Sequence, residues 1–510
     1  MITRRDLLVR AAAAAALAGW PRALFGEAAG DAVTDAFRAA LAKQPWLLGF
    51  AAAQRDSFAA TATLVTGRLP AALAGTLYRN GPAGHEVGGR RYHHWFDGDG
   101  LVQAFRIGDG RVEHRARFVA TRKRASELAA GTPQVPGFGT SWPDVPPPAS
   151  AAEGNVANIS VLAHAGRLLA LWEAGDAYAL DPATLATLGP HVWSPETAGV
   201  PFSAHPRLEP DGTLWNFGSA PWASALVLYR ISPSGTLAGT WTIPIERPGY
   251  IHDFAITERH AVFLIPPLHY DASSEATNFL ERHRWDPDAP TRILVVDKAD
   301  PAQRRWLEMP ACFVFHLANG WEGSDGTIRL DAFRYDDASI LFREQHDVMW
   351  GRWERRKAFS TPVRVTLHPT RGTVREERGD GIGEFPRVDP RRIGRRHRFV
   401  YSLAQQGDGT GRHPLFDAIE RRDLETGTVQ SWRYPGGVIP EEHVFVPRRD
   451  TASEGVGWLV GSSLDFERGV SQLCVFDAEA IDAGPLAVAR LDYALPLGFH
   501  GGFAPAAPLS

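Results

Sequence analysis

Four histidines stand in sequence contexts that could build a metal centre. Each lies at the edge of an apolar run, beside a small or turn-forming residue: His205, His252, His316 and His500. Neutral imidazoles are suitable ligands for iron, zinc and copper. The four are separated by 47, 64 and 184 residues. Different parts of the fold must therefore deliver them, with each ring at a strand end pointing to one centre. Spacing alone does not establish that they meet.

Three acidic residues could support such a centre from outside. Glu173, Glu384 and Glu442 lie inside or next to apolar, strand-like segments, where an unpaired charge is costly. A carboxylate that accepts the outer N–H of a ligand imidazole orients the ring and offsets the charge of the metal. The alternative interpretation of each acid is a salt-bridged residue at a strand edge.

Short strands are the elements that must position these side chains. From about residue 60 onward, short apolar or alternating runs are separated by turn signals such as Asp211-Gly212 and Pro435-Gly436. We expect roughly 25 to 30 strands, which suits a propeller of four-stranded blades better than a sandwich of about 100 residues. No strict internal repeat is visible. The strongest helix prediction covers Asp31–Lys43, and a shorter one covers Ala125–Ala130.

Composition excludes several classes of function. The 510 residues carry a net charge of -4, so no nucleic-acid partner is expected, because such proteins usually show a basic excess. The two cysteines, Cys312 and Cys474, lie in apolar runs and are interpreted as buried free thiols. Two cysteines are too few for a cysteine-ligated zinc or iron–sulfur site.

The N-terminus is interpreted as a targeting segment that is separate from the fold. Residues 1–30 contain the adjacent Arg4 and Arg5, followed by the apolar run Ala11–Trp20, which is too short to cross a bilayer. This pattern resembles a cleaved twin-arginine export signal; an ordinary alanine-rich helix is the alternative. It predicts a bacterial, periplasmic protein, with the twin-arginine translocase as a partner and at most peripheral membrane contact. Residues 31–59 would form a helical lead-in and 60–510 a single propeller domain.

An ordered series of motifs from about residue 60 to 505 resembles the carotenoid cleavage oxygenase family. The motifs are Leu77–Pro82, His94–Gly100, Ala204–Pro206, His252–Phe254, Phe315–Asn319, Glu442–Pro447 and Gly498–Gly501. No single motif is specific, but the set is, and it covers nearly the whole mature chain.

This resemblance implies an all-β, seven-bladed propeller with one iron(II) per chain on its axis, and loops and short helices capping the site. It implies that the four histidines are the metal ligands, and that the three glutamates hold their outer nitrogens: Glu173, Glu384 and Glu442. A hydrophobic tunnel would hold a carotenoid or apocarotenoid. Dioxygen would cleave one carbon–carbon double bond to give two carbonyl products. Four neutral histidines leave up to two positions of an octahedral iron open, and no protein acid or base is required.

Three positions depart from the family pattern. Leu317 follows the third histidine, His443 follows Glu442, and Ile159 stands where many members carry threonine near the iron. A bulkier Ile159 could fill an open coordination position or reshape the pocket. These departures bear on the choice of substrate more than on the metal.

Several other functions are compatible with the residues. His269-Tyr270-Asp271 has the spacing of a two-histidine, one-carboxylate iron site, although such matches arise by chance. A metal-free binding propeller is the non-enzyme alternative. Isomerisation with ester cleavage, found in a vertebrate branch of the family, is an enzymatic one. Among oxygenases, a stilbene cleavage dioxygenase would use a lysine and a tyrosine to engage a phenol. Lys123 could be that lysine, but we interpret it as a solvated surface charge.

Overall fold

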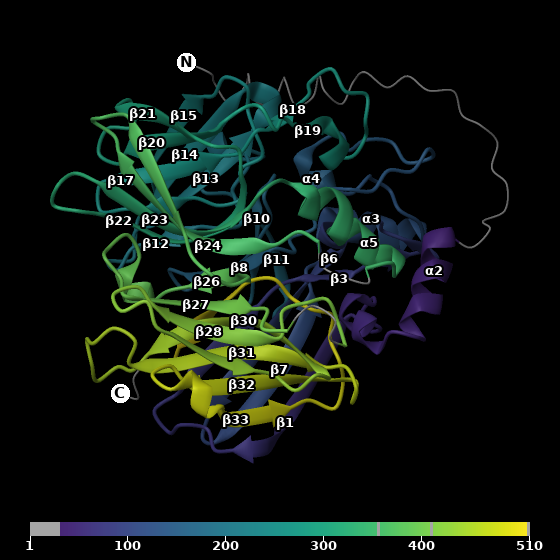
Figure 1. The fold of residues 1–510 in the computed structure, drawn as a ribbon. Coiled ribbons are helices and arrows are strands. Elements are labelled where there is room, and N and C mark those ends of the chain that lie inside the picture. The colour runs from purple at the N-terminus through teal and green to yellow at the C-terminus, as the bar shows by residue number, and fades with distance from the viewer. Residues whose placement is uncertain (1–30, 354–356, 408–411, 507–510) are drawn as a thin grey trace.

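The computed structural model describes residues 31–353, 357–407 and 412–506, so the predicted export signal lies outside the described part. Within that part the chain is built almost entirely of antiparallel strands (Figure 1). No helix in the described ranges is long and apolar enough to cross a membrane.

Five separate sheets of four strands each form the blades of the propeller. In chain order, the first three contain β8 (Ser160–His164), β9 (Arg167–Leu171), β10 (Ala177–Leu180) and β11 (Thr187–His191); β12 (Arg207–Leu208), β13 (Leu214–Ala220), β14 (Ala225–Ile231) and β15 (Leu237–Pro244); and β16 (Ala255–Ile256), β17 (His260–Ile265), β20 (Thr291–Asp297) and β21 (Arg304–Met309). The last two contain β22 (Phe313–Glu322), β23 (Ile328–Tyr335), β24 (Ser360–His368) and β25 (Thr373–Arg378); and β26 (Gly383–Arg387), β27 (Phe399–Ala404), β28 (Ala418–Asp423) and β29 (Val429–Arg433).

The two ends of the chain share one ten-stranded sheet. Its strands are β30 (Val438–Pro447), β31 (Gly457–Asp465), β32 (Val470–Asp477), β33 (Pro485–Arg490), β1 (Ser57–Gly67), β7 (Arg111–Phe118), β6 (Asp99–Gly108), β2 (Gly75–Arg79) and β34 (Gly501–Pro505), with β3 (Pro82–Gly84) paired to β6. The prediction of seven blades is therefore corrected: five blades are separate four-stranded sheets, and the strands of the remaining blades merge into the ten-stranded sheet. Two small two-stranded sheets complete the described strands: β4 (Glu86–Val87) with β5 (Arg90–Arg91), and β18 (Leu268–Tyr270) with β19 (His283–Trp285).

The length of β1 explains this merger. Its first half, Ser57–Ala62, pairs with β7, and its second half, Thr63–Gly67, pairs with β33 near the C-terminus. A register shift between Leu64 and Thr66 is the kind of irregularity that bends a strand and increases its twist. One strand of 11 residues thus hydrogen-bonds to two neighbours that could otherwise have belonged to separate blades.

The helices gather on one side of the sheets (Figure 1). They are α2 (Ala32–Leu41), α3 (Arg122–Ala130), α4 (Ala151–Gly154) and α5 (Gln345–Asp347), with a 3-10 turn at Pro45–Phe50 and a π turn at Ile340–Glu344. The prediction of a helix within Asp31–Lys43 is confirmed. Helix α3 begins three residues before the predicted start, because the Thr121 hydroxyl accepts the backbone N–H of Arg124 and caps it.

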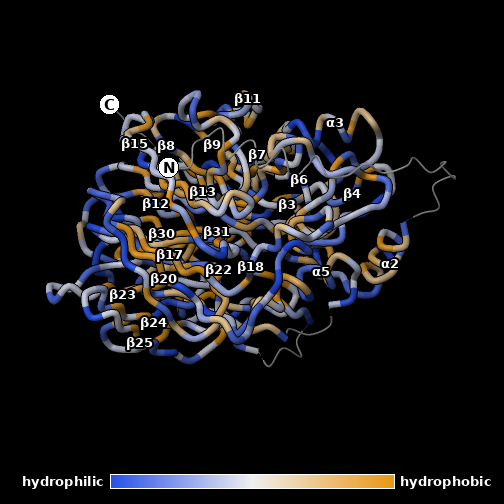
Figure 2. Tube along the Cα trace, turned by 90° about the horizontal axis from the view of Figure 1, so that it is seen from above, coloured by the Kyte–Doolittle hydropathy of each residue, from blue (hydrophilic) through white to orange (hydrophobic). Residues whose placement is uncertain are grey.

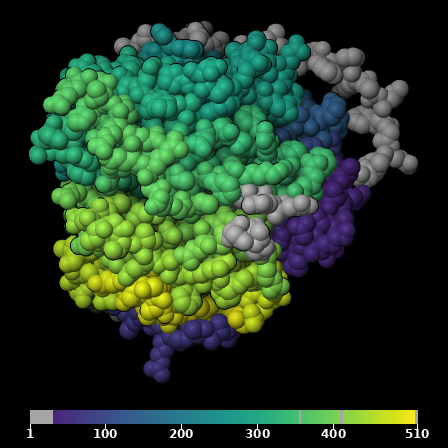
Figure 3. Space-filling view, in the orientation of Figure 1, coloured from purple at the N-terminus to yellow at the C-terminus, as the bar shows by residue number. Residues whose placement is uncertain are grey.

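The N-terminal segment packs against the residues around α5. Phe37, Trp46 and Phe50 share an apolar cluster with Val348 and Met349. The space-filling view shows this purple segment beside the green one (Figure 3). Burial of such aromatic side chains fixes the position of the short helical turns near residue 345.

Apolar side chains fill the space between neighbouring sheets, and the strands carry most of the hydrophobic residues (Figure 2). Central strands such as β14 are buried on both faces, which accounts for their nearly continuous apolar sequences. Cys312 and Cys474 are buried free thiols, as predicted.

Candidate metal centre

The four predicted histidines come together from four different sheets. His205 and His252 lie just before β12 and β16, His316 lies within β22, and His500 directly precedes β34. Each of these strands is the end strand of its sheet. Their potential ligand atoms all lie within 4.8 Å of one another. Within the described residues, this is the one group of three or more such side chains that converges in this way.

The inner nitrogens have the spacing of metal ligands. Nε2 of His205 and Nε2 of His252 are 3.0 Å apart. Two imidazole nitrogens that bind one ion at about 2.1 Å and at right angles are separated by about this distance. Nε2 of His316 is buried and has no hydrogen-bond partner among the described residues. A buried, unpartnered acceptor is costly, and a cation held by all four rings would satisfy it.

The outer nitrogens of three histidines are held by the three predicted glutamates. Nδ1 of His252 pairs with Glu173. Nδ1 of His316 lies 2.5 Å from Glu384, and Nδ1 of His500 lies 2.8 Å from Glu442. Each carboxylate accepts an N–H, which fixes the tautomer and leaves the Nε2 lone pair directed to the centre. The structure places no carboxylate on the outer nitrogen of His205 among the described contacts.

The glutamates are themselves held by residues that the sequence did not single out. The Tyr250 hydroxyl donates to Glu173, with both oxygens 3.0 Å away. The guanidinium of Arg387 donates to Glu442 at 2.9 Å. Tyr250 stands two residues before His252, and side chains at that spacing share a face of an extended segment. This spacing is a signal that could have identified it.

Phe385 marks backbone strain next to the centre. Its φ of +56° lies in the left-handed region, which a bulky residue rarely adopts. Its backbone N–H donates to the Glu384 carboxylate at 2.6 Å, and its ring lies against those of His316 and His500. Strained residues of this kind are concentrated at functional sites.

Burial keeps most of the rings neutral. It lowers the pKa of His316 to about 3 and that of His500 to about 4, and it holds the pKa of His205 well below the usual value. Burial also disfavours the charged form of His252, but the Glu173 carboxylate outweighs it and raises the pKa. Neutral rings have free lone pairs, which is the state that binds a metal.

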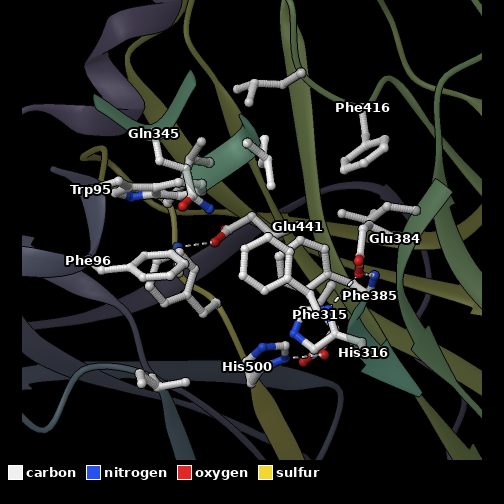
Figure 4. A pocket seen from close by; sticks show the side chains of 18 of the residues that line it. Trp95, Phe96, Phe315, His316, Gln345, Glu384, Phe385, Phe416, Glu441 and His500 are labelled. Atoms are coloured by element: carbon white, nitrogen blue, oxygen red, sulfur yellow. Dashed lines mark hydrogen bonds and ion pairs between the residues drawn. The ribbon is translucent and has the colours of Figure 1, made fainter. Parts of the chain in front are cut away.

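An apolar pocket opens beside the metal centre, and three of the four histidines line it: His252, His316 and His500. Figure 4 shows this pocket, with His316 and His500 labelled. The pocket comprises about 920 Å³ of non-atom space, part of it open to solvent. Aromatic rings form much of its wall, including Phe96, Phe315, Phe385 and Phe499, and Ile159 also lines it. Ile159 is thus placed at the pocket wall, where its side chain shapes the space next to the histidines.

Lys123 is not a solvated surface charge, and that prediction is wrong. The side chain is 1% exposed; its ammonium donates to Glu127 at 2.8 Å and to Asp99 at 3.1 Å. The ring of Tyr92 lies 4.3 Å from the ammonium, and the Tyr92 hydroxyl donates to Glu127 at 2.6 Å. The spacing of Lys123 and Glu127 places both on one face of α3, and that face packs inward.

The alternative triad does not assemble. His269 and Tyr270 belong to the short strand β18 (Leu268–Tyr270), and Asp271 accepts hydrogen bonds from Ser273. These residues are not part of any converging ligand group in the described ranges.

Comparison with known proteins agrees with this geometry. A family model described as retinal pigment epithelial membrane protein matches residues 51–505. The chain is 33% identical to an apocarotenoid-15,15'-oxygenase of Synechocystis sp., over 90% of this chain and 96% of that protein. It is 29% identical to an isoeugenol monooxygenase of Pseudomonas nitroreducens, over 86% and 94% respectively. The crystal structure of cobalt-substituted Synechocystis apocarotenoid oxygenase aligns with a TM-score of 0.80 at 31% identity, covering 91% of this chain and 98% of that one.

Proposed function

Because the chain belongs to the retinal pigment epithelial membrane protein family, which includes the carotenoid oxygenases, we propose that it is a non-haem iron(II) dioxygenase. It cleaves one carbon–carbon double bond of a carotenoid or apocarotenoid with dioxygen. Each carbon of the broken bond gains one oxygen atom, so the products are two carbonyl compounds.

One observation carries this proposal: four histidines, and no carboxylate, converge at the edge of an apolar pocket. The fold delivers His205, His252, His316 and His500 as the groups that would hold one metal ion per chain. Iron fits better than zinc, because zinc has no redox chemistry. When bound, iron(II) would supply the electron transfer that dioxygen needs in order to react with an electron-rich alkene.

The protein's own residues position the reactants and exclude water. The aromatic walls of the pocket bind a flat, conjugated chain by apolar contact. Glu173, Glu384 and Glu442 hold the rings through their outer nitrogens. The apolar walls of the pocket also limit the access of water to reactive species. None of the buried side chains needs to transfer a proton in this reaction, so a shallow dependence of turnover on pH is expected near neutrality.

The test is product analysis on protein loaded with iron(II) under anaerobic conditions. An apocarotenal and a hydroxystilbene are supplied side by side with isotopically labelled dioxygen, and the carbonyl fragments are identified by mass spectrometry. Cleavage of the apocarotenal with label in both fragments supports the proposal. Stoichiometric zinc in the purified protein, together with no cleavage after iron loading, would refute it. A protein that binds the compounds without any metal would instead be a binding propeller.

Cleavage of a phenolic alkene such as a stilbene is the second candidate. The likeness to isoeugenol monooxygenase favours it. A stilbene cleavage dioxygenase would need a lysine that engages the phenol of its substrate. Lys123 does not fit this role, because two carboxylates already hold its ammonium group. Preferential cleavage of the hydroxystilbene in the same assay would decide for this candidate.

The N-terminal segment is proposed to direct export. Its adjacent Arg4 and Arg5 would send a folded, metal-loaded protein through the twin-arginine translocase to the periplasm. Replacing both with lysine should leave the protein folded in the cytoplasm. The check is fractionation of the producing cells, and an unchanged periplasmic yield would point to another route.

A further inference from the structure

The apolar pocket contains a carboxamide side chain, that of Gln345, without a hydrogen-bond partner. Gln345 lines the pocket, and the residue is 7% exposed. Its Oε1 is buried without a hydrogen-bond partner, and no other described group hydrogen-bonds to its carboxamide. Leaving such a group unpaired in an apolar environment costs about 1–3 kcal/mol. The pocket therefore holds an amide whose hydrogen-bonding capacity is unused by the protein.

The backbone holds Gln345 in place. It follows directly on the π turn Ile340–Glu344, a rare geometry that often occurs at functional sites. Ile340 and Gln345 both line the pocket, so the wide turn presents an apolar group and an amide to the same space. The carboxylate of the intervening Glu344 accepts the backbone N–H groups of Lys357 and Ala358. Val348 and Met349, which follow a few residues later, pack against the N-terminal segment.

Gln345 lies away from the histidines. In Figure 4 its carboxamide points into the pocket beside Trp95, while His316 and His500 lie at the other end. Glu441 is a polar group between them, but its carboxylate already accepts from Arg79 at 3.2 Å and from the backbone N–H of Gly498 at 2.5 Å. The indole N–H of Trp95 also has no partner among the described residues, but it can only donate. Of these three groups, only the amide of Gln345 can both donate to a ligand and accept from it.

We propose that Gln345 binds an oxygen atom at one end of the substrate and thereby determines which double bond lies beside the histidines. A carboxamide can donate to a carbonyl, and it can both donate to and accept from a hydroxyl. The substrate class is therefore an alkene that carries a hydroxyl or a carbonyl group at a fixed distance from the cleaved bond. A pure hydrocarbon would leave the amide unpaired. This inference rests on the proposed function for the identity of the conjugated chain.

The test compares three ligands in the wild-type protein and in Gln345→Met. The ligands are an apocarotenal with a ring hydroxyl and two analogues, each lacking the oxygen at one end. Methionine has a similar shape to glutamine but no hydrogen-bonding amide. Binding is measured by quenching of tryptophan fluorescence in cobalt-substituted protein, so no turnover is needed. The products of the iron-loaded protein are then identified for each ligand.

Loss of one particular oxygen should weaken binding to the wild-type protein by about 10-fold to 100-fold, and to Gln345→Met by less than about 3-fold. The oxygen concerned identifies which end contacts Gln345. The iron-loaded variant should also cleave the conjugated substrate at more than one double bond. Without ligand, Gln345→Met should melt at the same temperature as the wild type or higher, because it removes an unpaired buried amide.

Three results would overturn the inference: equal binding of all three ligands to the wild type, a preference that persists in Gln345→Met, or no saturable binding at all. A preference that depends on Gln345, combined with no cleavage of any ligand, would leave this inference standing and reject the proposed reaction. The two failures are therefore distinguishable.

Discussion

The molecule contains two buried clusters of charged and polar groups, and they differ in what remains unpaired. Around Lys123, the ammonium contacts the carboxylates of Asp99 and Glu127, Arg124 also contacts Asp99, and every charge has an opposite partner. Around the four histidines, glutamates satisfy the outer nitrogens of three rings, while the inner nitrogens face one another. The first cluster is complete as it stands. The second requires a cation at its centre.

This difference shows how a functional site can be recognised in a buried polar cluster. Acidic residues in apolar surroundings occur in both places, and so does a tyrosine hydroxyl that donates to a glutamate: Tyr92 to Glu127 and Tyr250 to Glu173. The histidine cluster differs from the Lys123 cluster in one respect: its inner nitrogen acceptors converge on one point without a donor. A self-satisfied cluster maintains the fold, whereas a cluster with unused lone pairs is built for a ligand.

The largest expected effect is the loss of the metal in His252→Ala. This change removes one of four ligands, so it should exceed the effect of losing an outer carboxylate, which is about 10-fold to 100-fold in metal affinity. Elemental analysis of the purified variant should show almost no iron. His368→Ala, at a partly exposed histidine of β24, is the matched control and should keep about one iron per chain. Equal iron content in both variants would remove the proposed site.

Lys123→Met tests the other cluster and should affect stability alone. Removing the ammonium leaves the buried Glu127 carboxylate without an opposite charge, while Asp99 keeps Arg124 at 3.3 Å. We expect a loss of about 3–5 kcal/mol in the free energy of unfolding. Urea denaturation measures this change. The fraction that remains folded should carry the wild-type content of iron. A variant as stable as the wild type, or one that folds but has lost its iron, would contradict the separation of the two clusters.

Glu384→Gln should have an intermediate effect, confined to the metal centre. The amide oxygen can still accept the N–H of His316, but it carries no charge to strengthen the ligand. We expect activity or metal affinity to fall by about 10-fold to 100-fold, with little change in melting temperature. Turnover at saturating iron is measured alongside thermal unfolding. If turnover stays near the wild-type value, Glu384 has no influence on the metal through His316.

The smallest effects are expected from removing the two tyrosine hydroxyls. One removal should change metal affinity alone, and the other should change stability alone. Tyr250→Phe removes one donor from Glu173, and Tyr92→Phe removes one from Glu127. A hydrogen bond to a charged group contributes about 1.5–3 kcal/mol at most. We expect Tyr250→Phe to weaken metal binding by no more than about tenfold at unchanged stability. Tyr92→Phe should instead lower stability at unchanged metal affinity. The same change in both quantities for both variants would show that the clusters are coupled.

The sequence predicted the chemistry of the histidine cluster better than its surroundings. The apolar contexts of the four histidines and three glutamates were visible, and the structure brings those seven side chains together. The prediction for Lys123 was wrong because a basic run, Arg122 to Arg124, resembles a solvated face, and only the packing of α3 shows which residue turns inward. Gln345 and Phe385 owe their positions to a π turn and to a strained backbone, which depend on tertiary packing and leave no local pattern.

The number of separate blades could not be predicted from sequence patterns either. Strand lengths and turn signals predicted many short strands correctly. However, the merger of the sheets depends on which neighbours β1 finds at each half of its length, and one of these neighbours, β33, lies more than 400 residues away in the chain. Pairing over such a distance is decided by the closed shape of the whole fold.

That pairing has a consequence for the order of events during synthesis. Strand β1 is synthesised long before β33, so half of it has no partner until β33 follows, and β2 lacks its neighbour until β34 (Gly501–Pro505) follows. His500 belongs to the same late segment, and its carbonyl accepts the backbone N–H of Asn80. The propeller therefore closes, and the set of four histidines becomes complete, when the same late segment joins the fold. A nascent chain that has not yet delivered residues 485–505 exposes unpaired strand edges, and it can offer a metal at most three of the four histidines.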